Sequence, residues 1–552
     1  MACNMNIIEA IILLLLLLQT ANSIRLATNS RWIVNEATGK RVKLTCANWA
    51  AHMEPMIPEG LEKQPVKYIA TKIVETGFNC VRFTWPTFMF TRPGYGTHTV
   101  SQSLNILGLR DARAGIAKHN PQFLHMNLID AQKAVVDELG NIGLMVVLDN
   151  TISDPKWCCS WDDGNGFFGD ASFDPDEWLR GLALAADAYK SHPAVVAISL
   201  RNELRGDREN EADWYKYMRL GASDVHVVAP HLLVIVSGLS YDSNLGFLKS
   251  EPFGEDIGNK LVFEAHWYTF GTPAEQWKAQ TNLVCASMTL HVEDNVLFLI
   301  RGNPSYPVFF SEYGIDQTGV NEADNRFIGC LLATIVENDL DWALWAFQGS
   351  YMLREGRVNM GESYGIMDFN WVRPKNPSFV QKLQFARQMS QGSNPRSPTS
   401  YYKIFHPATG LCVQLAPRTN LIYLSGCAMA TRWDQHRHGG AIRPAGTQDQ
   451  CLVVMGNNVP AKVSRDCTSD RSKWKIVSAS RLHLAAQNGE WGHLCLHKND
   501  YENIIYTAKC LCVGDDLADL HTCAENPQRQ WFRFVHVTVD EFPIQTGNLT
   551  NY

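Results

Sequence analysis

Residues 194–203 (AVVAISLRNE) and 307–312 (PVFFSE) decide the fold that the sequence predicts. Each stretch is a short apolar run that ends in a glutamate, and such runs are typical of buried parallel strands. Proteins with parallel sheets build their active sites at the carboxyl ends of the strands. Glu203 and Glu312 are therefore the first candidates for catalysis.

Similar runs recur along the first part of the chain and alternate with segments of helical periodicity, such as residues 66–74, 131–139 and 327–336. Repeated alternation of this kind predicts an α/β fold, a (β/α)₈ TIM barrel over residues 24–389. A doubly wound open sheet remains the alternative, because periodicity does not show closure. The expected strands are residues 42–48, 80–84, 144–149, 195–200, 232–237, 261–265, 308–311 and 342–346.

Length and composition predict a protein of two domains with a neutral partner. The chain has 552 residues, of which 45% are hydrophobic and 19% charged. Its net charge of −7 is small for this length, and lysine and arginine are dispersed. We therefore expect neither nucleic acid nor a membrane surface as a partner. The oligomeric state cannot be inferred from the sequence.

The first 23 residues resemble a signal peptide. Residues 11–18 are continuously apolar, and residues 21–23 (ANS) are the small residues of a cleavage site. The positive charge that usually precedes the apolar run is missing. The sequence predicts secretion to the extracellular space and no later segment with the ~20 apolar residues of a membrane helix.

The cysteines also suit an oxidising compartment. Fifteen occur, and removal of Cys3 with the leader leaves an even number, which predicts disulfide bonds of unknown connectivity. Zinc is the competing interpretation of clustered cysteines, but paired CxxC motifs are lacking, so we expect neither a metal nor another cofactor.

Residues 390–400 are mostly small polar residues and turn formers, which predict a linker. Short β-type runs dominate the following residues 401–540, and residues 541–552 form a tail. Cysteine-centred triplets recur at 411–413, 450–452 and 494–496, and a tryptophan closes each unit: Trp433, Trp474 and Trp531.

Motifs at successive strand ends carry a resemblance. They are residues 81–83 (VRF), 201–203 (RNE), 266–268 (HWY), 311–314 (SEYG) and Trp345. In this order they resemble glycoside hydrolase family 5, the cellulase-like retaining enzymes with a (β/α)₈ barrel, and above all its plant and fungal members with a C-terminal β-trefoil. The triple repeat likewise resembles a ricin B-like trefoil, although its Gln-x-Trp and sugar-binding acidic residues are missing. Glycan binding and a purely structural role for this domain therefore remain open.

The resemblance implies roles for the strand-end residues. Glu203 would be the acid/base and Glu312 the nucleophile of a double displacement at a β-linked polysaccharide or oligosaccharide. Arg82 would keep Glu312 ionised, and Asn202 would bind the 2-hydroxyl group of the sugar.

Three aromatic residues complete the implied site. His266 and Tyr268, two apart on one strand face, would orient Glu203 and Glu312 respectively. Trp345 would stack on a pyranose ring. Further tryptophans near strand ends are candidates for sugar subsites, without a basis for choosing among them: Trp49, Trp85, Trp157, Trp161 and Trp267.

One position departs from the family pattern. Members commonly carry a histidine after the third strand, where this chain has Thr151. The loop that follows, residues 157–166, is expected to be a disulfide-tethered cleft loop. Because of Thr151 and the degenerate trefoil, a catalytically silent, lectin-like protein is the alternative to a secreted glycosidase.

Overall fold

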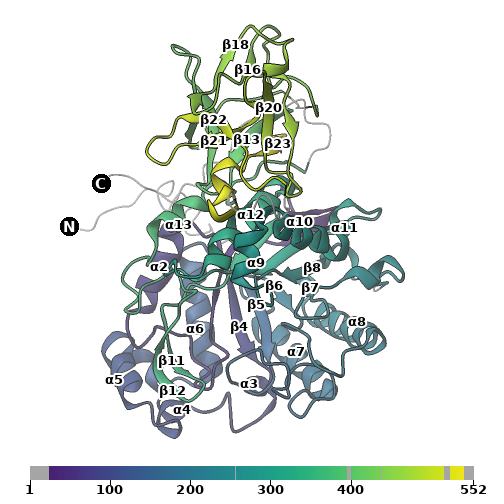
Figure 1. Ribbon diagram of the computed structural model, residues 1–552. Helices are drawn as coiled ribbons and strands as arrows, with labels where there is room; N and C mark the ends of the chain where they lie inside the picture. The colour runs from purple at the N-terminus through teal and green to yellow at the C-terminus, as the bar shows by residue number, and fades with distance from the viewer. Residues whose placement is uncertain (1–23, 255–256, 394–399, 435–436, 515–522, 540–552) are drawn as a thin grey trace, which may run out of the picture.

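A closed barrel of eight parallel strands forms the larger part of the protein, in which β10 pairs with β3 to complete the ring (Figure 1). The computed structural model describes residues 24–254, 257–393, 400–434, 437–514 and 523–539. The expected barrel is confirmed and the open-sheet alternative is wrong. The barrel strands are β3 (Thr45–Trp49), β4 (Cys80–Pro86), β5 (Met145–Ile152), β6 (Val195–Ser199), β7 (Leu233–Val236), β8 (Leu261–His266), β9 (Val308–Glu312) and β10 (Asp341–Leu344).

The predicted leader, the predicted tail and residues 394–399 of the predicted linker lie outside the described residues. The first linker residues contact the barrel, since the backbone N–H groups of Ser390 and Gln391 both donate to Asp339 Oδ2, at 2.9 and 2.7 Å.

Helices surround the barrel (Figure 1). In α6 (Leu128–Asn141), Ala131, Val135 and Leu139 recur on one face and are buried against the strands. Asn127 caps this helix by accepting a hydrogen bond from the backbone of Asp130. The other helices are α2 (Val66–Glu75), α3 (Phe88–Thr91), α4 (Val100–Ile106), α5 (Arg110–His119), α7 (Pro175–Tyr189), α8 (Glu211–Val228), α9 (Ala274–Ala279), α10 (Thr281–Val292), α11 (Phe298–Arg301), α12 (Glu322–Asn338) and α13 (Pro377–Lys382).

A hairpin covers the amino-terminal end of the barrel. It consists of β1 (Leu26–Asn29) and β2 (Trp32–Asn35), and Leu26 and Ile33 belong to the same buried cluster as the side chains inside the barrel. Lys260, directly before β8, donates from Nζ to the carbonyl of Leu26 at 2.7 Å. This hairpin does not cover the carboxyl ends of the barrel strands, where the candidate residues lie.

Strands β11 (Ser350–Arg354) and β12 (Arg357–Gly361) form a two-stranded antiparallel sheet of their own. The strands after them form a separate antiparallel region, residues 401–537, here called the C-terminal region. Each of its three units contains a short-range disulfide, and Trp433, Trp474 and Trp531 are fully buried. Its strands are β13 (Tyr401–His406), β14 (Leu411–Leu415), β15 (Ile422–Ser425), β16 (Cys451–Val453), β17 (Val459–Pro460), β18 (Lys462–Ser464), β19 (Lys475–Ile476), β20 (Leu484–Asn488), β21 (Gly492–Lys498), β22 (Ile505–Lys509) and β23 (Arg533–Val537). The structure confirms a strand-rich region; the trefoil stays a prediction.

The C-terminal region packs on α10 and α12 of the barrel (Figure 1). Asn282 of α10 makes three hydrogen bonds to it: Nδ2 donates to the carbonyl of Cys512 at 2.7 Å, while Oδ1 accepts from Ser480 Oγ at 2.7 Å and from Trp531 Nε1 at 3.0 Å. A Cβ atom at Gly329 would come within 3.2 Å of the Trp531 ring, so glycine permits this close packing.

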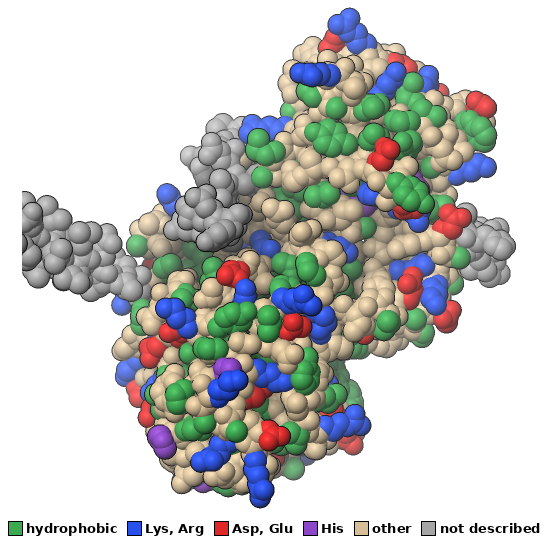
Figure 2. All heavy atoms as spheres, turned by 90° about the vertical axis from the view of Figure 1, so that its left-hand side faces the viewer, with side chains coloured by type: hydrophobic (Ala, Val, Ile, Leu, Met, Phe, Trp, Pro, Cys, Tyr) green, Lys and Arg blue, Asp and Glu red, His purple; other side chains and the backbone are tan. Residues whose placement is uncertain are grey.

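The segment Thr281–Arg301 qualifies as a membrane span by length and composition, contrary to the sequence expectation. The protein buries 39% of the apolar window of this segment, and Asn282 near its start is hydrogen-bonded to the C-terminal region. Charged side chains of both signs are interspersed on the face of the molecule seen in Figure 2.

Candidate active site

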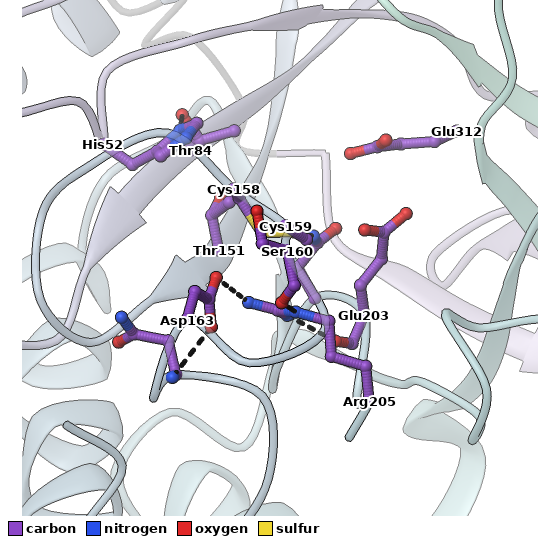
Figure 3. The surroundings of a disulfide bond; sticks show 12 residues. His52, Thr84, Thr151, Cys158, Cys159, Ser160, Asp163, Glu203, Arg205 and Glu312 are labelled. Carbon is purple, nitrogen blue, oxygen red and sulfur yellow. Dashed lines mark hydrogen bonds and ion pairs between the residues drawn. A yellow bond between two sulfur atoms is a disulfide. The ribbon is translucent and has the colours of Figure 1, made fainter. Parts of the chain in front are cut away.

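The two candidate glutamates meet at the carboxyl end of the barrel. Glu312 is the last residue of β9, the seventh barrel strand. Glu203 follows β6, the fourth, in a turn where its own φ is 42°. One carboxylate oxygen from each, together with a ring nitrogen of His266, lie within 4.8 Å of one another. Figure 3 shows the two carboxylates pointing toward each other.

Two donors hold the carboxylate of Glu312. Arg82 of β4 donates from Nη1 to Oε1 at 2.8 Å, and the hydroxyl of Tyr268 donates to Oε2 at 2.9 Å. Each oxygen of the Glu312 carboxylate therefore accepts a hydrogen bond from a protein side chain. The contacts expected of Arg82 and Tyr268 are present.

Glu203 has a different set of partners. Its Oε1 lies 2.8 Å from Nδ1 of His266. Its backbone N–H donates to Asp242 Oδ2 at 3.1 Å, and its carbonyl accepts from Arg205 Nη1 at 2.7 Å. Within the described residues, His266 is thus the hydrogen-bond partner of the Glu203 side chain, while the backbone of Glu203 is held by Asp242 and Arg205.

His266 is the last residue of β8, whereas Tyr268 lies two residues beyond it. The two side chains were expected on one face of a strand. They reach the site from the last residue of β8 and from the segment directly after it, because β8 ends at His266 and Tyr268 lies beyond the strand.

Arg82 connects the parts of the site. Its Nη2 donates to Asp149 Oδ1 at 2.7 Å and to Asn202 Oδ1 at 2.8 Å, and its Nη1 also reaches Asn48 Oδ1 at 3.0 Å. Burial alone would lower the pKa of Arg82, but the carboxylates of Asp149, Glu264 and Glu312 outweigh it and raise the pKa. Arg82 is therefore a permanent positive charge beneath the cleft.

The two carboxyl groups differ in what stabilises their charge. Burial raises the pKa of Glu203 and that of Glu312 to about 7. Burial also lowers the pKa of His266 to about 4, so this ring is neutral near pH 7. Arg82 then supplies the cationic hydrogen bond to Glu312, and Glu203 receives none. When one proton is shared by the pair, this arrangement favours the proton on Glu203.

Thr151 occupies the place of the absent family histidine. It is buried, and its hydroxyl donates to Asp149 Oδ2, which leaves the other oxygen of Asp149 to Arg82. His52 and Thr84 lie above Thr151 in the view of Figure 3, and His52 Nδ1 is 2.8 Å from Thr84 Oγ1. Thr151 thus supports the carboxylate that supports Arg82.

The structure separates the candidate tryptophans into two groups. Trp49, Trp85 and Trp267 are buried in the core. Trp345, at the end of the eighth strand, is half-buried and lies edge-on to Trp157, with ring centroids 6.2 Å apart. Trp161 is 51% exposed, and its Nε1 donates to Asp207. Trp157, Trp161 and Trp345 are the three with surface left for a ligand.

The loop with Cys158 and Cys159 differs from its prediction. The two cysteines bond to each other rather than to another element, so the disulfide does not tether the loop. Arg205 holds the loop instead: its Nε donates to the carbonyl of Ser160 at 2.9 Å and its Nη2 to Asp163 Oδ2 at 2.5 Å (Figure 3). The other twelve cysteines of the described residues form six disulfides, which confirms the expected disulfide bonding.

Sequence reasoning missed Asn48, Asp149, Asp242 and Glu264. Asp242 lies in the loop after β7, and its Oδ2 is 3.5 Å from His266 Nε2. Burial raises the pKa of Asp242 well above the usual range, with the Glu264 charge adding to it. Asp149 ends a predicted strand, a signal that could have identified it. Asp242 follows no such pattern.

Among the residues that the structure describes, two groups bring three potential metal-ligand atoms close together: Glu203 with His266 and Glu312, and Glu203 with Cys158 and Cys159. The first group is accounted for by the hydrogen bonds above. In the second group the sulfurs are bonded to each other and offer no thiolate.

Comparisons with known proteins agree with this geometry. The model for cellulase (glycosyl hydrolase family 5) matches residues 35–350. A glycosyl hydrolase 5 family protein from Chamaecyparis obtusa is 40% identical over 539 residues, which are 95% of each chain. An endoglucanase from Paenibacillus polymyxa is 20% identical over 63% of this chain and 84% of its own.

Solved structures share the barrel fold. The catalytic domain of the major endoglucanase from Xanthomonas campestris pv. campestris has a TM-score of 0.53 at 20% identity, over 66% of this chain and 99% of its own. An endocellulase from Pyrococcus horikoshii has a TM-score of 0.52 at 17% identity, over 67% and 100%. The chain belongs to glycosyl hydrolase family 5 and is a cellulase-like glycosidase.

Proposed function

We propose that this family 5 glycosidase cleaves β-linked glucan of cellulose type by double displacement, with Glu203 as acid/base and Glu312 as nucleophile. The spacing of the two carboxyl groups carries the proposal. Their oxygens come within 4.8 Å of each other. Retaining hydrolases hold the carboxyl groups about 5 to 5.5 Å apart, whereas inverting enzymes leave ~6.5 to 9.5 Å for a water molecule.

The hydrogen bonds support separate roles. Glu312, with Arg82 and Tyr268 donating to it, is suited to attack the anomeric carbon as a carboxylate. Glu203, whose pKa burial raises to about 7, holds a proton for the leaving oxygen at mildly acidic pH. After departure of the leaving group, the Glu203 carboxylate accepts a proton from water, which releases the glycosyl group from Glu312.

Asn202 is suited to bind the 2-hydroxyl group of the sugar. Arg82 occupies its Oδ1, so its NH₂ group faces the cleft side. A hydrogen bond from this amide that strengthens in the transition state would contribute several kcal/mol. His266 would position Glu203, and Trp345 would stack on the sugar.

The choice of glucan is supported by the relatives. The matching proteins from Paenibacillus polymyxa and Xanthomonas campestris pv. campestris are named endoglucanases. The neutral, aromatic cleft residues Trp157, Trp161 and Trp345 suit an uncharged sugar polymer. The seven disulfides and an extracellular relative support secretion.

For the C-terminal region we propose a ricin B-like β-trefoil. Three similar disulfides, closing 15, 16 and 15 residues, and three buried tryptophans support a threefold repeat. Glycan binding by this region stays a prediction, to be measured as retention of the full chain on insoluble glucan with the cleft blocked.

A mechanism-based 2-deoxy-2-fluoro-β-cellobioside tests the assignment. We expect the purified full-length protein to be inactivated and the peptide containing Glu312 to carry the glycosyl label. Release of reducing sugar from a polysaccharide panel identifies the substrate. Binding of glucan without any release of sugar or labelling would favour the silent, lectin-like alternative.

A further inference from the structure

The disulfide between the neighbouring residues Cys158 and Cys159 faces the proposed catalytic pair. Both sulfurs and one carboxylate oxygen of Glu203 lie within 4.8 Å of one another. Both cysteines are half-buried, so part of their surface remains open. Figure 3 shows the disulfide between Thr151 and the carboxylates of Glu203 and Glu312.

Asn202 links the disulfide to the site. Its Nδ2 lies 3.6 Å from Cys159 Sγ and 3.9 Å from Cys158 Sγ. A guanidinium group only donates hydrogen bonds, so the oxygen of the Asn202 amide must face Arg82 and the NH₂ group must face the sulfurs. The disulfide therefore borders the position at which Asn202 meets the sugar.

The loop that presents the sulfurs is held rigidly. Arg205 donates to the carbonyls of both Ser160 and Glu203, at 2.9 and 2.7 Å, and so joins the loop to the acid/base. At the start of the loop, Trp157 packs against Tyr351. The guanidinium group of Arg354 lies 3.4 Å from the centroid of the Trp157 ring. The sulfurs are thus fixed relative to Glu203.

The position of this bond argues against a general stabilising role. A disulfide stabilises chiefly by closing a loop in the unfolded chain, and the effect grows with loop length. The other six close separations of 11 to 45 residues, whereas this one joins adjacent residues. What it adds is local: two uncharged, polarisable sulfur atoms at a fixed place in the cleft.

We propose that the Cys158–Cys159 disulfide is a substrate-contacting wall, whose sulfurs pack against the apolar C–H face of the pyranose ring beside Glu203 and Asn202. The bond thereby determines how tightly the enzyme binds a β-linked gluco-oligosaccharide. This inference rests on the proposed function. It assigns the sugar-contacting surface on this side of the cleft to the disulfide, near Thr151.

The test compares two barrel disulfides. The variant C158A/C159A removes the wall, and the matched control C285A/C330A removes the bond between α10 and α12. Both are made in the full chain, alone and with E312Q. We measure kcat and KM on soluble β-glucan, the thermal unfolding midpoint, and the Kd for cellotetraose in the E312Q background, where hydrolysis does not interfere.

We expect C158A/C159A to weaken cellotetraose binding about ten-fold or more, in line with the loss of apolar contact in a binding site, with little change in the unfolding midpoint. C285A/C330A should lower the midpoint and leave the Kd unchanged. The inference is overturned if C158A/C159A binds cellotetraose within two-fold of its parent. It is also overturned if the Kd rises only together with a fall in the midpoint as large as that of the control.

The same measurements separate this inference from the proposed function. If the wild-type protein is labelled at Glu312 and C158A/C159A binds as tightly as its parent, only the wall is wrong. If the wild-type protein neither hydrolyses glucan nor is labelled, the proposed function fails, while the Kd comparison still decides the role of the disulfide in binding.

Discussion

The barrel mouth and the C-terminal region differ in the side chains that they bury: the mouth buries a cluster of charged groups, and the C-terminal region buries tryptophans. At the mouth, the carboxyl groups of Asp149, Asp242, Glu264 and Glu312 are buried together with Arg82. Loss of contact with water raises the pKa of Glu264 and Glu312 there, and that of the neighbouring Glu203. In the C-terminal region the large buried groups are tryptophans, and each donates its indole N–H to an oxygen. Disulfides close each of its units.

The contrast separates function from stability. Buried charges destabilise a fold unless they are paired, so a cluster such as that around Arg82 is retained for what it does. Buried tryptophans and disulfides are ordinary sources of stability in a protein domain. Substitutions in the two regions should therefore affect different measurements.

The largest effect is expected for the catalytic carboxyl groups. E312Q removes the attacking carboxylate, and E203Q removes the proton donor while preserving shape. Each should lower kcat/KM on glucan by roughly 10³-fold or more. The matched control is E337Q on α12, whose carboxylate instead accepts a hydrogen bond from Arg533 of the C-terminal region. Full activity in E203Q and E312Q would contradict the conclusion that the buried charged groups at the barrel mouth serve catalysis.

The next effect concerns the junction of the two regions. N282A removes the acceptor of Ser480 and Trp531 and the donor to Cys512, so the buried indole N–H of Trp531 loses the hydrogen bond that Asn282 Oδ1 accepts from it. The free energy of unfolding should fall by about 2–4 kcal/mol, while kcat/KM on a soluble substrate stays unchanged. The control S287A lies on the exposed face of the same helix. A loss of activity without a loss of stability would mean that the junction acts on the site.

A smaller difference is expected in the dependence of stability on pH. Burial raises the pKa of Glu203 to about 7, so the folded state holds its proton more tightly than the unfolded chain. This stabilisation is complete below pH 4.5 and is lost as the pH rises toward 7. Burial lowers the pKa of His483 in the C-terminal region to about 3, so its contribution is complete above pH 6.5 and is lost as the pH falls.

The two variants E203Q and H483Q should therefore change the pH slope of the unfolding free energy in opposite directions, by about 1–3 kcal/mol across pH 4.5 to 7.5. Urea denaturation at several pH values measures the slopes. E203Q should lose less stability than the parent toward pH 7.5, and H483Q less toward pH 4.5. Parallel slopes for both variants would contradict the electrostatic account.

The sequence predicted the barrel well because its signals are local. Each of the eight strands is a short apolar run. Glu312 ends β9 and Glu203 follows β6 by four residues, whereas Arg82 lies inside β4. Residues that a strand places at its carboxyl end must share the mouth of a closed barrel. The resemblance to family 5 then supplied roles that spacing alone could not.

What the sequence missed depends on contacts between distant segments. Asp242 reaches Glu203 and His266 from an irregular loop in which its own φ is 59°, a conformation that no periodicity reveals. The pairing of Cys158 with Cys159 is also unpredictable from spacing, since either could have bonded elsewhere. The partition of the tryptophans into core and cleft likewise required the tertiary structure.

The stereochemistry of hydrolysis tests the central claim most directly. The proposed double displacement, for which the approach of the Glu203 and Glu312 oxygens to within 4.8 Å is the main support, predicts that the product keeps the configuration of the cleaved bond. Proton NMR of the anomeric signals during the first minutes of hydrolysis of a β-linked cello-oligosaccharide should show the β-anomer first and the α-anomer only later, through mutarotation. Initial formation of the α-anomer would contradict the double-displacement mechanism and the roles assigned to both residues.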